Sequence, residues 1–169
     1  MSNTSPVRVA VDHAGTWTEI TDAVPTEAVA RIVAADLREG QQARTALRSD
    51  AVAAGKDADS VAVFLDIEFH IADDARTARR EFAALDVPAV PGSIRYVGTA
   101  AGLAGLVADV KAAEVADGVT LVAVGPEARN LADVAAGVVP WLEDRGVAFQ
   151  VDGLLAATGA MPSARELAS

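Results

Sequence analysis

The chain has 169 residues, of which 51% are hydrophobic and only 4% aromatic, so it can form one core, built mainly from Ala, Val and Leu. Asp and Glu outnumber Lys and Arg by 24 to 14, and the formal net charge of -10 disfavours binding to nucleic acid or to anionic membranes. The lack of cysteine excludes disulfides, thiolate nucleophiles and cysteine metal sites.

We expect a single domain over residues 1–169, with flexible ends at residues 1–6 and about 150–169. The polar N-terminal residues show no basic region followed by an apolar run, and no stretch is long and apolar enough for a transmembrane helix. The expected location is therefore cytoplasmic, with no membrane partner.

The first part of the chain predicts short elements. Residues 7–11 predict a strand, and residues 18–24 predict a brief helix that stops before Pro25. Residues 29–34 are β-branched enough for a second strand, although the alanines that follow are also compatible with a helix. Asp36 is the expected N-cap of a helix over residues 37–54, which Gly55 ends.

The clearest strand is VAVFLDIEFHI, residues 61–71. Its odd positions are all apolar, which is typical of a strand with one continuous buried face. Its even positions begin with Ala62 and Phe64 and end with Asp66, Glu68 and His70. Titratable groups at one end of a strand are typical of an enzyme active site, and also of a sheet strand that is half exposed.

Strands and helices continue to alternate after residue 71. We expect a helix capped by Asp73 or Asp74, a loop at residues 86–93, a strand at 94–97, a helix capped by Thr99, a strand covered on both faces at 119–124, and a closing helix at 131–145 kinked at Pro140. Beyond Val147 no period is visible. This alternation predicts an α/β fold with a parallel sheet of about five strands and crossover helices.

Four segments resemble the C-terminal part of the luciferase-like flavin monooxygenases, the superfamily of bacterial luciferase and many FMN- or F420-dependent oxidoreductases. The segments are AVAAGKDADSVAVFLDIEF, YVGTAAGLAGLVADV, VADGVTLVAV and LADVAAGVVPWLEDRGV. They stand in the family's order and span roughly residues 28–147. The resemblance implies about half of a (β/α)₈ barrel, that is, a partial TIM-barrel-like sheet, with any site at the carboxyl ends of its strands. It implies FMN or F420 as a cofactor, although the family's N-terminal half, which holds most of the flavin, has no counterpart here.

The candidate catalytic residues are Asp66, Glu68, His70 and His13. Side chains two positions apart on a strand lie about 7 Å apart, so the first three could converge on a ligand, or they could simply solvate an exposed sheet face. His13 follows the first strand, where catalytic loops gather in barrels, but a solvated turn histidine is the plainer interpretation. We expect no metal site, because one strand does not readily focus three ligands on an ion.

The candidate cofactor-binding residues are Gly98, Thr99 and Arg95. The Gly98–Thr99 turn could bind an anion through backbone amides, but it lacks a nucleotide-loop glycine pattern and fits a structural turn better. Arg31 and Arg95 could meet a flavin phosphate, or could pair with Asp66 and Glu68. Trp17 and Trp141 could stack on a flavin, although Trp141 is expected to pack on the closing helix.

Two functions remain open. The first is a luciferase-like, flavin-dependent oxidoreductase or monooxygenase, in a shortened form or as one piece of a two-chain enzyme. The second is a non-catalytic luciferase-like subunit that acts in oligomerisation or partner binding. A half barrel exposes strand edges and an apolar inner face, so we expect a homodimer, a partner chain that supplies the other half, or helices that shift across the open face.

Overall fold

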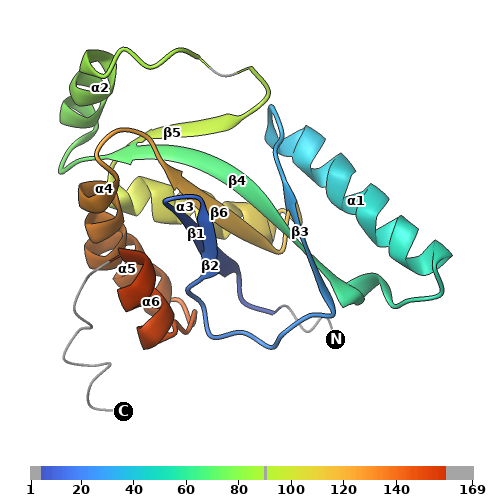
Figure 1. Ribbon diagram of the computed structural model, residues 1–169. Helices are drawn as coiled ribbons and strands as arrows, with labels where there is room; N and C mark the ends of the chain where they lie inside the picture. Colours follow the sequence, from blue (N-terminus) through green and yellow to red (C-terminus); the bar gives the residue numbers. More distant parts are fainter. Residues whose placement is uncertain (1–4, 90, 159–169) are drawn as a thin grey trace.

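In the computed structural model, which describes residues 5–89 and 91–158, one mixed sheet of six strands organises the molecule (Figure 1). The strands are β1 (Arg8–His13), β2 (Thr16–Glu19), β3 (Ala28–Ile32), β4 (Val61–Ile71), β5 (Ile94–Gly98) and β6 (Gly118–Ala123). β4 pairs in parallel with β3, β5 and β6, β1 pairs in parallel with β6, and β2 is antiparallel to β1. The predicted sheet of about five parallel strands is confirmed.

The helices follow the predicted order closely. They are α1 (Leu37–Ala53), α2 (Ala75–Ala84), α3 (Ala100–Ala112), α4 (Glu127–Asp133), α5 (Val139–Glu143) and α6 (Val151–Thr158), with a 3₁₀ turn η1 (Ala58–Ser60) and a π-helical turn η2 (Val134–Val138). The side chains of Asp36, Asp74 and Thr99 each accept a hydrogen bond from a backbone amide in the first turn of the following helix. The predicted helix starts are therefore confirmed.

β4 is the central strand, as its alternating sequence predicts. Its odd residues from Val63 to Ile71 are completely buried, and Leu65 to Ile71 join the main core with α3, η2 and α5. Its even residues face the other side, where Ala62 and Phe64 form a small second core with Ala10 of β1 and Trp17 of β2. The sheet thus has a large apolar core on one face and a smaller, more polar environment on the other.

The order of the strands decides on which face α2 lies. Both β3 and β5 pair with the same edge of β4, β3 along its first half and β5 along its second. The chain passes from β3 to β4 and then back from β4 to β5. Because both crossovers are right-handed, the connection that runs back must lie on the opposite face of the sheet from the connection that runs forward. Accordingly α2 covers the even face at the carboxyl end of β4, where the Arg95 guanidinium lies 5.1 Å from the ring centre of Phe82.

The sheet is strongly curled, with the even face concave. Arg31 of β3 bonds to Asp12 of β1 at 2.9 Å although β4 and β6 separate the two strands. In a flat sheet these strands would lie about 14 Å apart, three strand spacings, which exceeds the reach of one side chain. We refer below to this even face of β4 and its neighbours as the concave face. The chain therefore has a half-barrel sheet.

The predicted helix at residues 18–24 is wrong. The chain instead makes β2, joined to β1 by the two-residue turn Ala14–Gly15, whose φ angles are both positive, at 50° and 80°. Two positive φ angles are what a type I′ hairpin requires, and such turns favour Asn-Gly or Gly-Gly rather than Ala-Gly. The hairpin therefore carries a weak sequence signal.

The segment after Val147 also differs from expectation, because α6 forms at residues 151–158 and buries Leu154 and Ala157. The segment before α6 pairs with the residues that follow β2: the backbone amide of Gln150 donates to the carbonyl of Ile20, and the amide of Asp22 donates to the carbonyl of Ala148. The remaining residues predicted to be flexible, 1–4 and 159–169, lie outside the described part. In the closing helix, where the sequence predicts a kink at Pro140, a π-helical turn at residues 134–138 precedes this proline.

Candidate functional site

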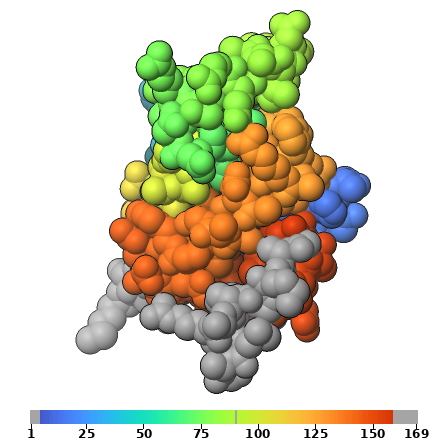
Figure 2. All heavy atoms as spheres, turned by 90° about the vertical axis from the view of Figure 1, so that its left-hand side faces the viewer, coloured from blue at the N-terminus to red at the C-terminus, as the bar shows by residue number. Residues whose placement is uncertain are grey.

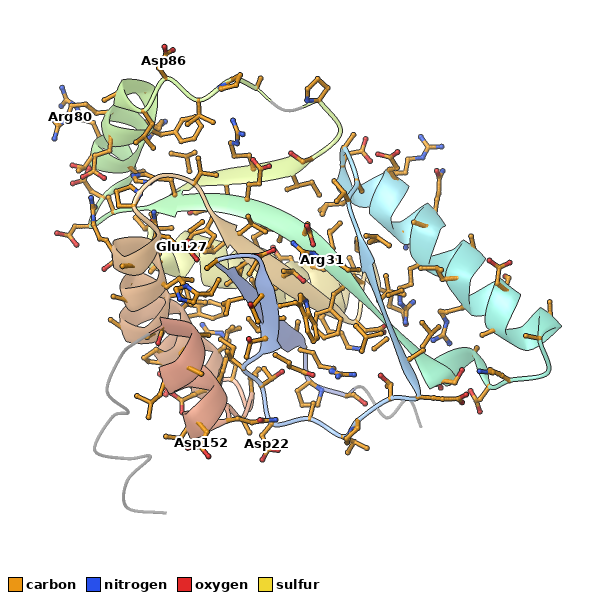
Figure 3. The ribbon with its side chains drawn as sticks, in the orientation of Figure 1. Asp22, Arg31, Arg80, Asp86, Glu127 and Asp152 are labelled. Carbon is orange, nitrogen blue, oxygen red and sulfur yellow. The ribbon has the colours of Figure 1, made fainter. Side chains whose placement is uncertain are left out.

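Asp66 lies at the middle of the concave face and is held by Arg31. The guanidinium donates to both carboxylate oxygens, at 2.7 and 3.0 Å, and also reaches Asp12 of β1 at 2.9 Å. Figure 3 shows Arg31 among the strands at the centre of the molecule. The hydrogen bond to Asp66 is the main reason why the pKa of Arg31 is raised. Three strands are thus tied together by one guanidinium. Of the two roles considered for Arg31, internal pairing is the one that the structure shows.

Glu68 is held in the same way by its neighbour on β5. The Nε and Nη2 atoms of Arg95 lie 2.8 and 2.7 Å from Glu68 Oε2, and the guanidinium also packs over Phe82 of α2. Arg95, a candidate for the flavin phosphate, is therefore paired with a carboxylate and covered by an aromatic ring. An incoming anion would have to compete with Glu68.

His70 is buried beneath α2, with 1% of its surface exposed. Its Nε2 lies 2.9 Å from Glu81 of α2, and its Nδ1 lies 3.1 Å from the carbonyl oxygen of Val124. Arg129 of α4 contacts the same Glu81 carboxylate at 3.0 Å. The hydrogen bond from His70, followed by that from Arg129, holds the pKa of Glu81 below its ordinary value.

The contacts of Glu81 with His70 and Arg129 hold α2 at the carboxyl end of the sheet, and we refer to these three residues as the latch. Figure 2 shows the corresponding surface, on which α2 (green) lies beside the orange segment that contains α4 and α5. Asp66, Glu68 and His70 share one face of β4, as the alternation predicts, but each turns toward a different basic or acidic partner. They do not converge on a common point.

His13 is the last residue of β1, rather than part of a following loop. Its Nδ1 lies 2.8 Å from Glu127 Oε1 at the start of α4, and the amide of Ala14 donates to the same oxygen at 2.9 Å. Because the carboxylate accepts, Nδ1 carries the proton, and in the neutral tautomer Nε2 is left with its lone pair. Glu127 is separated from His13 by 114 positions, so only the fold identifies this pair.

Gly98 and Thr99 serve the packing and start of α3. The Thr99 hydroxyl accepts from the Gly102 amide at 3.1 Å, and a Cβ on Gly98 would lie 2.5 Å from the Tyr96 hydroxyl. The turn therefore needs its glycine to accommodate Tyr96. Trp17 packs edge-on against Phe64 and donates to Thr120 at 2.9 Å, while Trp141 packs against the main core and stacks with Arg145.

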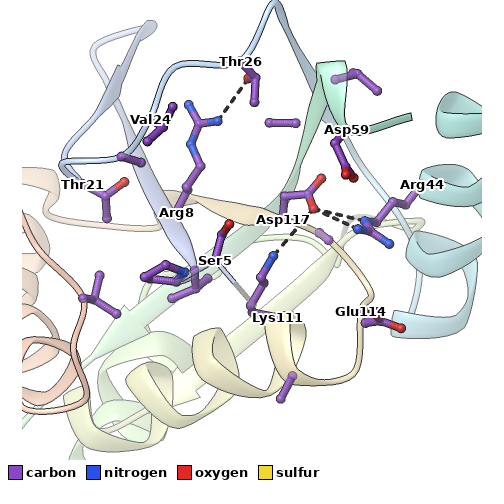
Figure 4. Close-up of a pocket in the computed structure, with 18 of the residues that line it drawn as sticks. Ser5, Arg8, Thr21, Val24, Thr26, Arg44, Asp59, Lys111, Glu114 and Asp117 are labelled. Carbon is purple, nitrogen blue, oxygen red and sulfur yellow. Dashed lines mark hydrogen bonds and ion pairs between the residues drawn. The ribbon is translucent and has the colours of Figure 1, made fainter. Parts of the chain in front are cut away.

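A cleft of about 770 Å³ lies at the other end of the sheet, beside the first residues of β1, β4 and β6 (Figure 4). We refer to it as the amino-end cleft; the residues used below are Val24, Arg44, Arg48, Val61, Lys111, Asp117 and Val147. Asp117 joins several elements here: its side chain accepts from the Val63 amide at 2.8 Å and from Arg44 of α1 at 3.0 Å. The sequence suggests only a helix end at Asp117, so this role was missed.

Two further properties hold for residues 5–89 and 91–158. None of the helices there has the length and apolar character needed to cross a membrane. No three or more His, Asp or Glu side chains are grouped so that they could hold a metal ion.

Neither the family models nor the curated proteins compared with this chain give a match. Solved structures do match. Long-chain alkane monooxygenase (LadA) superimposes with a TM-score of 0.61 at 17% identity over 73% of this chain and 38% of its own. Riboflavin lyase (RcaE), crystallised with modified FMN and riboflavin, gives 0.60 at 15% over 90% and 53%. EDTA monooxygenase (EmoA) from Chelativorans sp. BNC1 gives 0.59 at 17% over 79% and 46%. This chain thus has the fold of part of these proteins and spans about half of their length or less.

Proposed function

We propose that this chain is a luciferase-like protein that takes part in a flavin-dependent oxidation or monooxygenation, as a shortened form or as one piece of a two-chain enzyme. The observation that carries the proposal is the shared fold with two monooxygenases and with a lyase crystallised with modified FMN and riboflavin. The four luciferase-like segments stand in family order and fall on the end of α1 with β4, on β5 with α3, on β6, and on the closing helices, which supports the proposal further.

The described residues fit a flavin only in part. In barrel enzymes the site lies at the carboxyl ends of the strands, which here means the region around His13, Asp12 and Arg31. The guanidinium groups of Arg31 and Arg95 are both engaged by carboxylates, and α2 covers the concave face over His70. A flavin in this region would need further contacts beyond those that the described residues offer.

The exposed edge at β3 is the proposed contact for that polypeptide, most simply a second copy of this chain. Among the described residues, β3 pairs only with β4, and Val29 and Val33 are 44% and 59% exposed. The residues that follow β2, by contrast, are hydrogen-bonded to residues 148–150. Light scattering coupled to size-exclusion chromatography tests this contact. A monodisperse monomer at micromolar concentration would contradict the homodimer.

A non-catalytic luciferase-like subunit is the second candidate, and one observation favours it. Asp66, Glu68 and His70 are all bonded to partners within the chain, and Trp17 and Phe64 fill the concave face. The concave face is therefore stabilised by contacts within the chain and does not need a ligand to satisfy these side chains. It offers no group that is both aligned for chemistry and free of a partner on β4.

Titration with FMN and with F420 separates the two candidates. The enzyme proposal expects saturable quenching of flavin fluorescence, and a weaker response for His13→Gln if the ligand lies at the carboxyl end. Lys56→Met, a surface cation paired with Glu27, is the matched control that should bind like the wild type. Absence of binding by the oligomer present in solution would contradict the enzyme proposal and support the non-catalytic subunit.

A further inference from the structure

The amino-end cleft has a charged wall made by two helices. Arg44 and Arg48 lie one turn apart on α1 and therefore project from the same side of the helix. Lys111 comes from the last turn of α3. In Figure 4, Arg44 and Lys111 approach Asp117 from two directions, so that two cations share one carboxylate.

Lys111 is the cation with the weakest partner. Its Nζ lies 3.8 Å from Asp117 Oδ1, which is too far for a hydrogen bond, and among the described residues no other acceptor is bonded to it. Its side chain is nevertheless only 20% exposed. No side-chain nitrogen or oxygen atom of the described residues is both buried and without a hydrogen-bond partner, so the Lys111 ammonium, which has no such partner there, is still reached by solvent. An external anion can therefore bind to it as a charge-assisted acceptor.

The opposite side of the cleft is apolar. Val24 and Thr21 lie across the cleft from Arg44 (Figure 4), and Val61 and Val147 complete this wall. Val24 is 86% exposed, the largest value among the exposed large hydrophobic side chains of the described residues. A ligand that covers Val24 would remove apolar surface from water, which is favourable.

The acidic residues around the cleft limit the charge of the ligand. Asp22, Asp59 and Glu114 also line it, and Asp59 is paired with Arg48 at 2.7 Å. Arg44 and Lys111 leave one cation in excess at Asp117 itself. The lining as a whole is formally neutral, because Arg8, Arg44, Arg48 and Lys111 are balanced by Asp22, Asp59, Glu114 and Asp117. Phosphate dianions and polyanions would meet these carboxylates, so the charge pattern favours a ligand with a single negative charge at Asp117.

We propose that the amino-end cleft binds a small organic carboxylate, with its carboxylate group at Lys111 and Arg44 and its apolar body against Val24, Val61 and Val147. This site lies at the end of the sheet opposite to the proposed flavin region. It does not depend on the flavin proposal, because its ligand and its residues are different.

The test is a titration of the full chain with hexanoate, followed by calorimetry and by amide chemical shifts in two-dimensional NMR. We expect shifts localised to the residues around Val24, Lys111 and Asp117. Lys111→Met should weaken binding about tenfold or more, because it removes a charged hydrogen-bond donor while keeping a side chain of similar length. Lys56→Met, which removes a cation outside the cleft, should leave the affinity unchanged.

Val24→Asp provides a second variant whose folding is not in doubt, since Val24 is 86% exposed. It places a carboxylate on the apolar wall and should abolish hexanoate binding. The proposal is overturned if hexanoate does not bind, if it binds Val24→Asp or Lys111→Met as well as the wild type, or if inorganic phosphate or hexanol binds equally tightly. None of these measurements requires flavin.

Discussion

At the carboxyl end of the concave face, Asp66, Glu68 and His70 are each held by a partner on another element, whereas at the amino end two cations share Asp117. The first arrangement uses charge to hold β3, β5 and α2 onto β4. The second leaves Lys111 without a hydrogen bond among the described residues. The two ends therefore differ in how their charges are used: the polar residues of β4 are all paired within the chain, whereas Lys111 has only a distant carboxylate.

The largest effect is expected where one carboxylate joins the elements of the amino end. Asp117→Ala would leave the Val63 amide without its acceptor and Arg44 and Lys111 without their shared counter-charge. We expect a loss of about 3 kcal/mol in the free energy of unfolding, measured by urea denaturation. Asp59→Ala, at a carboxylate that is 81% exposed, should change it by only about 0.5 kcal/mol. Equal losses would mean that Asp117 is an ordinary surface charge.

At the carboxyl end, Arg31→Met tests whether charge maintains the curl of the sheet. Its removal leaves Asp12 and Asp66 without the guanidinium that bridges β1, β4 and β3, and we expect destabilisation of about 2 kcal/mol. The measurement is again urea denaturation. Adding Asp66→Asn to Arg31→Met should restore part of the loss, because it removes one unpaired carboxylate. A double variant that is less stable than Arg31→Met alone would contradict this explanation.

The sequence alone predicts those features of the two ends that depend on local residue pattern. The alternation of residues 61–71 identifies β4 and places Asp66, Glu68 and His70 on one face, and Asp36, Asp74 and Thr99 identify three helix starts. These features depend on neighbouring residues only. The partners of the polar side chains depend on the tertiary fold: Glu127 meets His13, and Glu81 meets His70 and Arg129, only after distant segments pack together.

Two features of the structure have a physical cause that a single sequence hides. β2 is only four residues long and follows a turn without an Asn-Gly signal, so the sequence instead predicts a helix from Thr18 onward. The position of α2 depends on β5 pairing with the same edge of β4 as β3, which periodicity cannot reveal. The burial of His70 beneath α2 is therefore a consequence of the strand order.

The latch on α2 should weaken in acid. The hydrogen bonds from His70 and Arg129 lower the pKa of Glu81 below its ordinary value, so the unfolded chain binds a proton at higher pH than the folded chain does. The stabilisation is present above about pH 4.5 and is lost as the pH falls through the folded pKa. In unfolding experiments across this range, the difference in stability between wild type and Glu81→Gln should shrink as the pH falls.

Asp74 provides the control for this pH dependence. Its pKa is also lowered, mainly by the hydrogen bond from the Thr77 amide, but it does not contact His70. Glu81→Gln should therefore retain the acid dependence that Asp74 contributes, and Asp74→Asn should retain that of Glu81. A difference between wild type and Glu81→Gln that stays constant from neutral to acid pH would contradict the latch.

The smallest effect is expected at the hairpin that carries His13. Ala14 has a φ of 50°, which costs an alanine about 1 kcal/mol, and Gly15 follows with a φ of 80°. Ala14→Asn creates the sequence preferred in type I′ turns and should stabilise the chain by about 0.5 to 1 kcal/mol in urea denaturation. The amide of Ala14 that donates to Glu127 is retained, so the imidazole should keep its Nδ1–H tautomer in ¹⁵N spectra.

The matched control is Glu127→Gln, which leaves the turn intact but replaces the acceptor of His13, and should alter the tautomer ratio without the gain in stability. If Ala14→Asn and Glu127→Gln both stabilise the chain, the energetic cost at this end of the sheet lies with the Glu127 carboxylate rather than with the turn.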